Sequence, residues 1–270
     1  MSALARLSLN QETTRNWPMP DLVAGCVAAG VRGVGLWRRQ VGQYGLARTA
    51  KLLRDNGLRA TSLCRGGFFT DPATWDSSLA DNRRALDEAA ELGADVLALV
   101  CGGIPDRDLD GARERVVEAL AVLGPKAADR GVRLAVEPLH PMFCSDRAVV
   151  STLAQAVDIA ERFPAEQVGV LVDAYHVWWD PEVYRQIRRA GPRIAAFQVA
   201  DWVTPLPAGA LTGRGMLGAG CVELRRLREA VDAAGYDGPI EVEIFNEELW
   251  ARPGAEVLAE VVARFAEHVG

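Results

Sequence analysis

The sequence is poor in histidine and has no excess of positive charge. Its 270 residues include 3 histidines, and 36 acidic residues outnumber 30 basic ones, which gives a formal net charge of −6. Affinity for nucleic acids rests on Lys and Arg neutralising phosphates. The acidic balance therefore argues against a nucleic-acid partner.

Long apolar runs and targeting signals are also missing. No stretch approaches 18 uninterrupted apolar residues, so we expect neither a transmembrane helix nor a membrane partner. The first residues, MSALARLSLN, lack a long apolar region after a basic start, so no secretory signal is expected. The 5 cysteines form no CxxC pair and are odd in number. They predict reduced thiols in a cytoplasmic protein rather than disulfides or a zinc–thiolate site.

What the chain does have is a regular alternation of short apolar runs and longer amphipathic segments. The runs predict strands over residues 4–9, 33–36, 59–63, 96–100, 133–137, 168–172, 194–199 and 240–245. The segments between and after them predict helices over residues 20–29, 44–56, 79–92, 110–130, 147–163, 181–190, 222–234 and 254–268. Pro20 and Pro181 stand at helix starts, where a missing N–H has no cost.

Glycines mark the ends of four of these helices. Gly57, Gly93, Gly131 and Gly235 each follow a helical stretch, where a left-handed residue favours glycine. Eight strand-then-helix units predict a parallel sheet closed into a single (β/α)₈ TIM barrel, one domain over residues 1–270. An open doubly wound sheet is disfavoured because no GxGxxG or GxxxxGK[ST] follows any strand.

Polar residues stand at the ends of four successive predicted strands. Glu137, Asp173 and Glu243 are carboxylates in or beside apolar runs, and Gln198 lies on the strand between the last two. The C-terminal ends of barrel strands face the active-site mouth. Buried carboxylates are costly unless they are paired or bind a cation. Such hard oxygen donors suit one divalent ion, Mn²⁺ or Mg²⁺, with Zn²⁺ or Co²⁺ as alternatives.

A structural explanation competes for each residue taken singly. One acidic residue at a strand end usually caps a helix or pairs with a basic side chain. Glu241 and Glu243 alternate with apolar residues and share a face, so one of them could simply pair with an arginine. The joint pattern on four strands favours a metal site.

Five segments carry a resemblance to a known family. LAVEPLHP, VDAYH, QVADW, GRGMLGAG and IEVEIF resemble the sugar phosphate isomerase/epimerase family of the xylose-isomerase-like TIM barrel superfamily, over nearly the whole chain. The resemblance implies a (β/α)₈ fold and one catalytic divalent ion, often Mn²⁺ or Mg²⁺.

By position, Glu137, Asp173 and Glu243 match the family's three carboxylate ligands. The fourth ligand is usually histidine, and here it is Gln198. An amide oxygen can bind a hard cation, though it lacks the preference of imidazole for softer metals. A glutamine at this place also resembles the 3-dehydroshikimate dehydratase branch of the superfamily.

The resemblance also implies residues that touch the substrate. His176 matches the histidine of a DxxH motif, which contacts substrate or moves a proton. Arg214 matches a loop arginine that binds substrate oxygens, and Asp201 occupies a position typically in the site. His140 and Arg65, in loops after the fifth and third strands, are further candidate substrate contacts.

Such a site favours proton abstraction next to a carbonyl through a metal-stabilised enediolate. We expect an isomerase or epimerase of a small polyhydroxylated carbonyl compound such as a sugar or keto-sugar. Glu137, Glu243 and His176 are its candidate catalytic residues.

The alternative is a lyase of the same superfamily, either 3-dehydroshikimate dehydratase-like or eliminating from a 3-keto-glycoside. An abasic-site nuclease, which needs several metal ions and a set of histidines, is disfavoured by the 3 histidines. A non-catalytic sugar-binding barrel and a homo-oligomer stay open.

Overall fold

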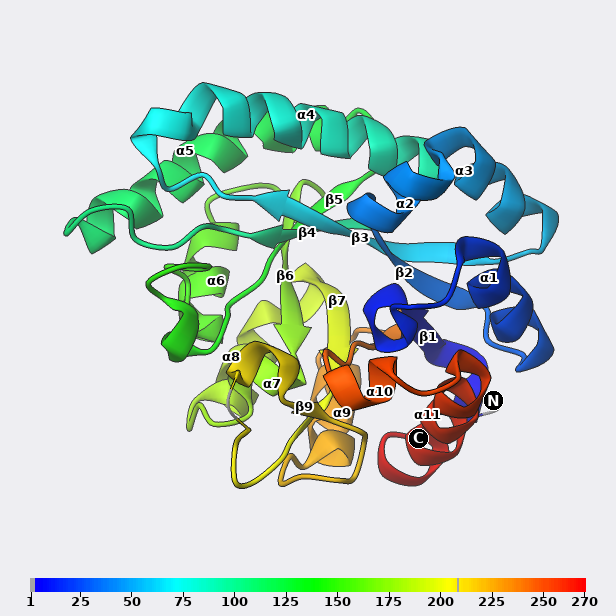
Figure 1. Cartoon of the computed structure of the whole chain (residues 1–270). Helices are drawn as coiled ribbons and strands as arrows, with labels where there is room; N and C mark the ends of the chain where they lie inside the picture. The colour runs from blue at the N-terminus through cyan, green and yellow to red at the C-terminus, as the bar shows by residue number, and fades with distance from the viewer. Residues whose placement is uncertain (1–2, 208) are drawn as a thin grey trace.

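The computed structural model describes residues 3–207 and 209–270 and forms a closed barrel (Figure 1). The barrel order is β1-β10-β7-β6-β5-β4-β3-β2, and every pair in it is parallel. Its eight strands, counted over the described residues, are β1 (Leu7–Asn10), β2 (Gly33–Trp37), β3 (Arg59–Gly67), β4 (Val96–Val100), β5 (Arg133–Val136), β6 (Val168–Asp173), β7 (Ile194–Val199) and β10 (Ile240–Val242). The predicted TIM barrel is confirmed.

Helices surround this barrel (Figure 1). The longer ones are α1 (Met19–Ala28), α2 (Arg38–Tyr44), α3 (Leu46–Asp55), α4 (Trp75–Leu92), α5 (Leu109–Ala128), α6 (Leu153–Ala160), α8 (Val183–Ala190), α9 (Leu224–Ala233) and α11 (Gly254–His268). Two single turns, α7 (Ala174–Val177) and α10 (Glu247–Trp250), follow β6 and β10. A short antiparallel pair, β8 (Asp201–Trp202) and β9 (Arg214–Gly215), lies outside the barrel sheet. The 3₁₀ turns are Ala3–Arg6, Gln11–Thr14, Pro72–Thr74, Pro141–Phe143, Gly191–Arg193 and Ala210–Thr212.

The predicted helix ends are confirmed at the glycines. Gly57, Gly93, Gly131 and Gly235 have φ between 64° and 95°, in the region that costs glycine least. Each peptide N–H closes the last helical turn, as when Gly93 donates to the Ala90 carbonyl. Each turn returns the chain to the foot of the barrel for the next strand.

Two predicted helices differ in extent. The helix expected over residues 44–56 corresponds to α3, which begins at Leu46 because Gly45 adopts φ 107°, and the helix before it, α2, was not predicted. The helix expected over 147–163 begins only at Leu153, after Thr152 caps the peptide N–H of Gln155. Residues before it form a loop in which Ala148 bridges to Gly102.

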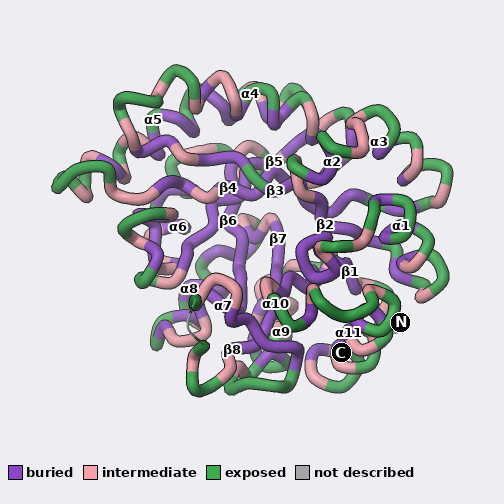
Figure 2. Tube along the Cα trace, in the orientation of Figure 1, coloured by how far each residue is buried: buried purple, intermediate pink, exposed green. Residues whose placement is uncertain are grey.

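Strand alternation divides the buried residues into two sets. On β10, Ile240 and Val242 join the large core between the barrel and its helices, whereas Glu241 lies at the alternate, inward position. Small side chains from five strands fill part of the interior: Cys64, Val96, Ala98, Ala135, Leu171 and Ala196. Figure 2 shows the barrel strands mostly buried and the helices exposed on their outer faces. None of the described helices is long and apolar enough to cross a membrane.

Candidate metal and proton-transfer site

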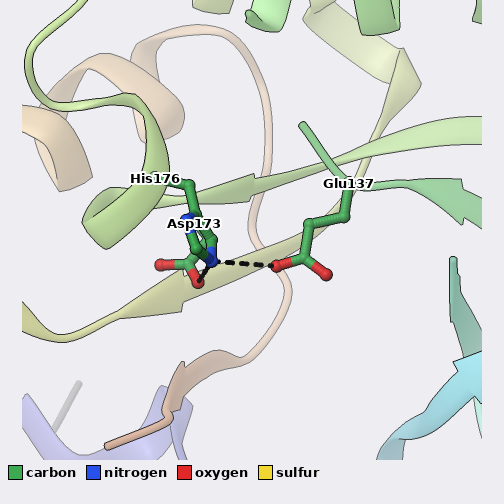
Figure 3. Close-up of side chains that lie close together, drawn as sticks. All are labelled: Glu137, Asp173 and His176. Carbon is green, nitrogen blue, oxygen red and sulfur yellow. Dashed lines mark ion pairs between the residues drawn. The ribbon is translucent and has the colours of Figure 1, made fainter. Parts of the chain in front are cut away.

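Three polar side chains meet where β5 and β6 end (Figure 3). Glu137 directly follows β5, Asp173 is the last residue of β6, and His176 lies in the single turn of α7. The Nε2 atom of His176 is 3.9 Å from a Glu137 oxygen and 3.7 Å from an Asp173 oxygen. One candidate ligand atom from each residue lies within 4.8 Å of the others, and all three residues are buried.

Arg214 connects a third strand end, that of β10, to this cluster. Its Nη1 atom donates to Asp173 Oδ2 at 3.1 Å and to Glu243 Oε2 at 3.0 Å. The guanidinium lies over the rings of Tyr175 and Phe245, at 4.8 and 4.9 Å from their centroids. The arginine is fixed because β9 is tied to the end of β10: its peptide N–H donates to the Phe245 carbonyl.

The cluster holds more negative than positive charge. Glu137, Asp173 and Glu243 are all at most 6% exposed, and Arg214 is the cation that forms ion pairs with two of them. Burial, with Asp173 and Glu243 nearby, raises the pKa of Glu137 well above its ordinary value. Burial also raises the pKa of Glu243 to about 8, although Arg214 opposes the rise. Burial likewise raises the pKa of Asp173 against the same arginine.

His176 lies between two hydrogen-bond donors and the carboxylates. The peptide N–H of His140 donates to His176 Nδ1 at 3.1 Å, and Arg214 Nη2 lies 3.2 Å from His176 Nε2. Burial, with Arg214 and His140 adding to it, holds the pKa of His176 well below its ordinary value. The neutral ring has one lone pair, so it accepts from one of these two donors: the bond from His140 favours the proton on Nε2, and the bond from Arg214 favours it on Nδ1.

Gln198 lies between Asp173 and Glu241 in the strand register. Its Nε2 donates to Glu241 Oε1 at 2.9 Å. Its Oε1 is buried and has no hydrogen-bond partner within the described structure. The large majority of buried polar atoms have a hydrogen-bond partner, so a buried amide oxygen without one indicates a place for a bound ligand.

These observations fit a divalent cation. Once ionised, three buried carboxylates with one paired arginine would carry a surplus of two negative charges, which a divalent ion would balance. Glu137 makes no side-chain hydrogen bond among residues 3–207 and 209–270, so its oxygens are free to ligate. The free oxygen of Gln198 adds a hard donor on the next strand.

The other predicted substrate contacts lie at the rim. His140 packs against the rings of Trp202 and Trp179, at 5.0 and 5.4 Å between centroids. The Arg65 guanidinium lies 4.0 Å from the centre of the Phe68 ring. Arg65 also borders a cavity of about 330 Å³ that reaches Trp37, Cys64 and Phe245. No ion pair joins Arg65 to an acidic residue in the part of the chain that is described.

The Asp201 carboxylate accepts hydrogen bonds from peptide N–H groups. Its Oδ1 accepts from the N–H groups of Trp202 and Val222, and its Oδ2 accepts from that of Gly218. These three bonds fold the loop that carries Arg214, which gives Asp201 a structural use whether or not substrate reaches it.

The sequence matches the model of the xylose isomerase-like TIM barrel family over residues 23–261. The chain belongs to this family. The crystal structure of protein SMc04130 from Sinorhizobium meliloti 1021 is 45% identical and superposes with a TM-score of 0.95, covering 98% of this chain and 99% of that one. A structure of the IOLI protein with a bound zinc atom gives a TM-score of 0.86 over 98% of both chains. Its 20% identity shows the common fold alone.

Curated relatives of this xylose isomerase-like barrel are enzymes of more than one class. The 3-dehydroshikimate dehydratase of Pseudomonas putida is 27% identical over 263 residues, which covers 90% of this chain and 38% of the dehydratase. The chain therefore spans well under half the length of that relative. The ketose 3-epimerase of Arthrobacter globiformis is 24% identical over 210 residues, covering 74% of this chain and 68% of the epimerase.

Two features of the site were not predicted from the residues. One is the direct pairing of Arg214 with two of the expected ligands, Asp173 and Glu243. The other is the set of polar side chains around Glu241, contributed by β1 and β3. Polar residues at alternate positions of β1, Ser8 and Asn10, were the available signal for this set.

Proposed function

We propose that this chain is a divalent-metal-dependent isomerase or epimerase of a small polyhydroxylated carbonyl compound, such as a sugar or keto-sugar. The observation that carries the proposal is the cluster of three buried carboxylates from three strand ends, two of which pair with the same arginine. The ketose 3-epimerase among its relatives supports the same reaction class.

Glu137, Asp173 and Glu243, with the oxygen of Gln198, would hold the ion. Their oxygen donors favour Mn²⁺ or Mg²⁺ over softer metals such as Zn²⁺ or Co²⁺. A divalent ion there would supply Lewis-acid stabilisation of the negative charge that develops on a substrate carbonyl oxygen.

The protein's own groups would move the proton. Glu137 and Glu243 follow β5 and β10, so a substrate bound between them would have a carboxylate on each side. One would take the proton next to the carbonyl, and the other would return it to the opposite face in epimerisation. His176 would donate to a substrate oxygen in the tautomer that carries the proton on Nε2, which the hydrogen bond from His140 to Nδ1 favours, and Arg214 would bind a second oxygen.

A lyase is the second candidate, and Gln198 favours it. The same carbanion would lose a β-leaving group instead of regaining a proton. The dehydratase relative, which matches 90% of this chain, supports this alternative. Both candidates share the first step, so one experiment tests them together.

The test is hydrogen exchange followed by NMR. The Mn²⁺-loaded protein would be incubated in D₂O with ketohexoses, 3-keto-glucosides, inosose and 3-dehydroshikimate. We expect deuterium at the carbon next to a carbonyl, lost in Glu243→Gln and in His176→Ala. The product then separates the candidates: a rearranged or epimerised compound indicates an isomerase, and an unsaturated one indicates a lyase.

A matched control keeps the result specific. Asp87→Asn changes an exposed carboxylate that pairs with Arg130 on the outside of α4, so exchange should match the unsubstituted protein. Exchange that persists in Glu243→Gln would contradict its assignment as a proton-transfer residue. If the protein binds no Mn²⁺, the assignment of the metal site is wrong.

A further inference from the structure

Glu241 is a buried carboxylate that the proposed reaction does not use. It lies inside the barrel, 3% exposed, two residues before Glu243 on the same face of the strand. Four side chains donate to its two oxygens: Asn10 at 2.6 Å, Ser62 at 2.8 Å, Thr61 at 2.9 Å and Gln198 at 2.9 Å. With four donors around its two oxygens, the carboxylate acts only as a hydrogen-bond acceptor.

The barrel makes room for this carboxylate at Gly35. A β-carbon added to Gly35 on β2 would lie 2.3–2.6 Å from the carboxyl atoms of Glu241. Because four hydrogen bonds hold Glu241 in place, the carboxylate could not retreat without breaking some of them. Its position is therefore fixed both by donors and by the absence of a side chain opposite.

The Glu241 carboxylate determines which end of the Gln198 side-chain amide faces it. An ionised carboxylate offers no proton, so the NH₂ group must face Glu241 and the oxygen must face away. The oxygen is the buried atom without a partner, and the next strand on its other side ends in Asp173.

We propose that Glu241 is a positioning residue that holds the oxygen of Gln198, rather than its nitrogen, toward the metal ion. This inference rests on the proposed function. Partners behind a ligand commonly fix its orientation, and their loss costs a factor of about 10–100 in metal affinity. Glu241 does this for an amide, where the wrong orientation would present two N–H donors to a cation.

The experiment is calorimetric titration of chelator-treated protein with Mn²⁺. Glu241→Gln keeps the size of the side chain but can donate as well as accept, so the Gln198 amide can turn over. We expect binding of Mn²⁺ to weaken by about tenfold. Gln198→Ala, which removes the oxygen, should weaken it at least as much.

The matched control separates orientation from charge. Glu12→Gln also removes a buried carboxylate, and Glu12 is, like Glu241, one of the charges that raise the pKa of Glu243. Glu12 makes no contact with Gln198: it accepts from Gln40 and pairs with Arg15. Charge loss alone would weaken Mn²⁺ binding equally in both variants, and that result would overturn the proposal.

Other outcomes are equally decisive. Thermal unfolding without metal checks that each variant is folded, and Gly35→Ala displaces the same carboxylate if Glu241→Gln does not fold. If Gln198→Ala binds Mn²⁺ like the unsubstituted protein, Gln198 is no ligand and the positioning role fails, while the three-carboxylate site and the proposed function stand. If the unsubstituted protein binds no Mn²⁺, the proposed function fails as well.

Discussion

At the scale of single residues, Arg214 has two uses that compete with each other. Its guanidinium pairs with Asp173 and Glu243, yet these carboxylates are also the expected ligands of the ion. Burying charges is favourable only when they are paired. On the proposed function, the arginine would stabilise the carboxylates before a divalent ion binds, and it would become free to bind substrate oxygens once the ion shares their charge.

Replacing Arg214 by Met should reveal this exchange. The substitution leaves the buried carboxylates without a cation, so the free energy of unfolding of chelator-treated protein at pH 8 should fall by about 3 kcal/mol. Mn²⁺ should recover much of the loss, since the ion supplies the missing positive charge. Urea unfolding with and without Mn²⁺ measures both effects.

A surface arginine provides the comparison for that experiment. Arg130 pairs with the exposed Asp87, and Arg130→Met should change stability by no more than about 1 kcal/mol with or without Mn²⁺. Equal losses in the two variants would mean that Arg214 does not carry the charge balance of the cluster.

At the scale of elements, the ribbon of β8 and β9 positions Arg214 from outside the barrel. Asp201 holds the loop beyond β9 by accepting from three peptide N–H groups, those of Trp202, Gly218 and Val222. Asp201→Ala removes both acceptor oxygens and so all three hydrogen bonds at once. Amide hydrogen exchange in residues 214–222 should rise by about tenfold, because local opening needs less free energy.

The same variant distinguishes a structural from a binding role for Asp201. If the residue acts only through the loop, amide hydrogen exchange should rise in residues 214–222 and stay unchanged in β5 and β6. Unaltered exchange in residues 214–222, together with weaker substrate binding, would instead assign Asp201 directly to the substrate.

The elements were largely predictable because each rests on local chemistry. Strand periodicity and the helix-ending glycines, such as Gly93 and Gly131, predicted the barrel, whereas motifs such as LAVEPLHP and VDAYH carried the family resemblance. Strand ends also indicated Glu137 and Asp173. The pairing partner of Arg214 and the donors around Glu241 could not be read from the residues, because they join segments as distant as Asn10 and Glu241 through the closure of the barrel.

At the scale of the whole molecule, the charge surplus should appear in how stability depends on pH. The pKa of Glu243 is raised from its ordinary 4.5 to about 8, so the folded protein keeps a proton that the unfolded chain releases between these values. The free energy of unfolding therefore falls as pH rises through that window. His176 acts oppositely, because its lowered pKa means that the unfolded chain holds the extra proton, but only below about its ordinary 6.5.

Between pH 6.5 and pH 8 the buried carboxyl groups determine whether the free energy of unfolding rises or falls with pH. Chelator-treated protein should lose stability with rising pH, by up to about 1.4 kcal/mol per pH unit for each carboxyl group that releases its proton. Saturating Mn²⁺ should flatten or reverse the slope, because the ion binds the ionised form. Glu243→Gln should reduce the slope without metal, and urea unfolding at several pH values measures each case. If the free energy of unfolding instead rises from pH 6.5 to pH 8 without metal, Arg214 already balances the charge of the cluster. The cluster would then have no surplus negative charge for a divalent ion to balance.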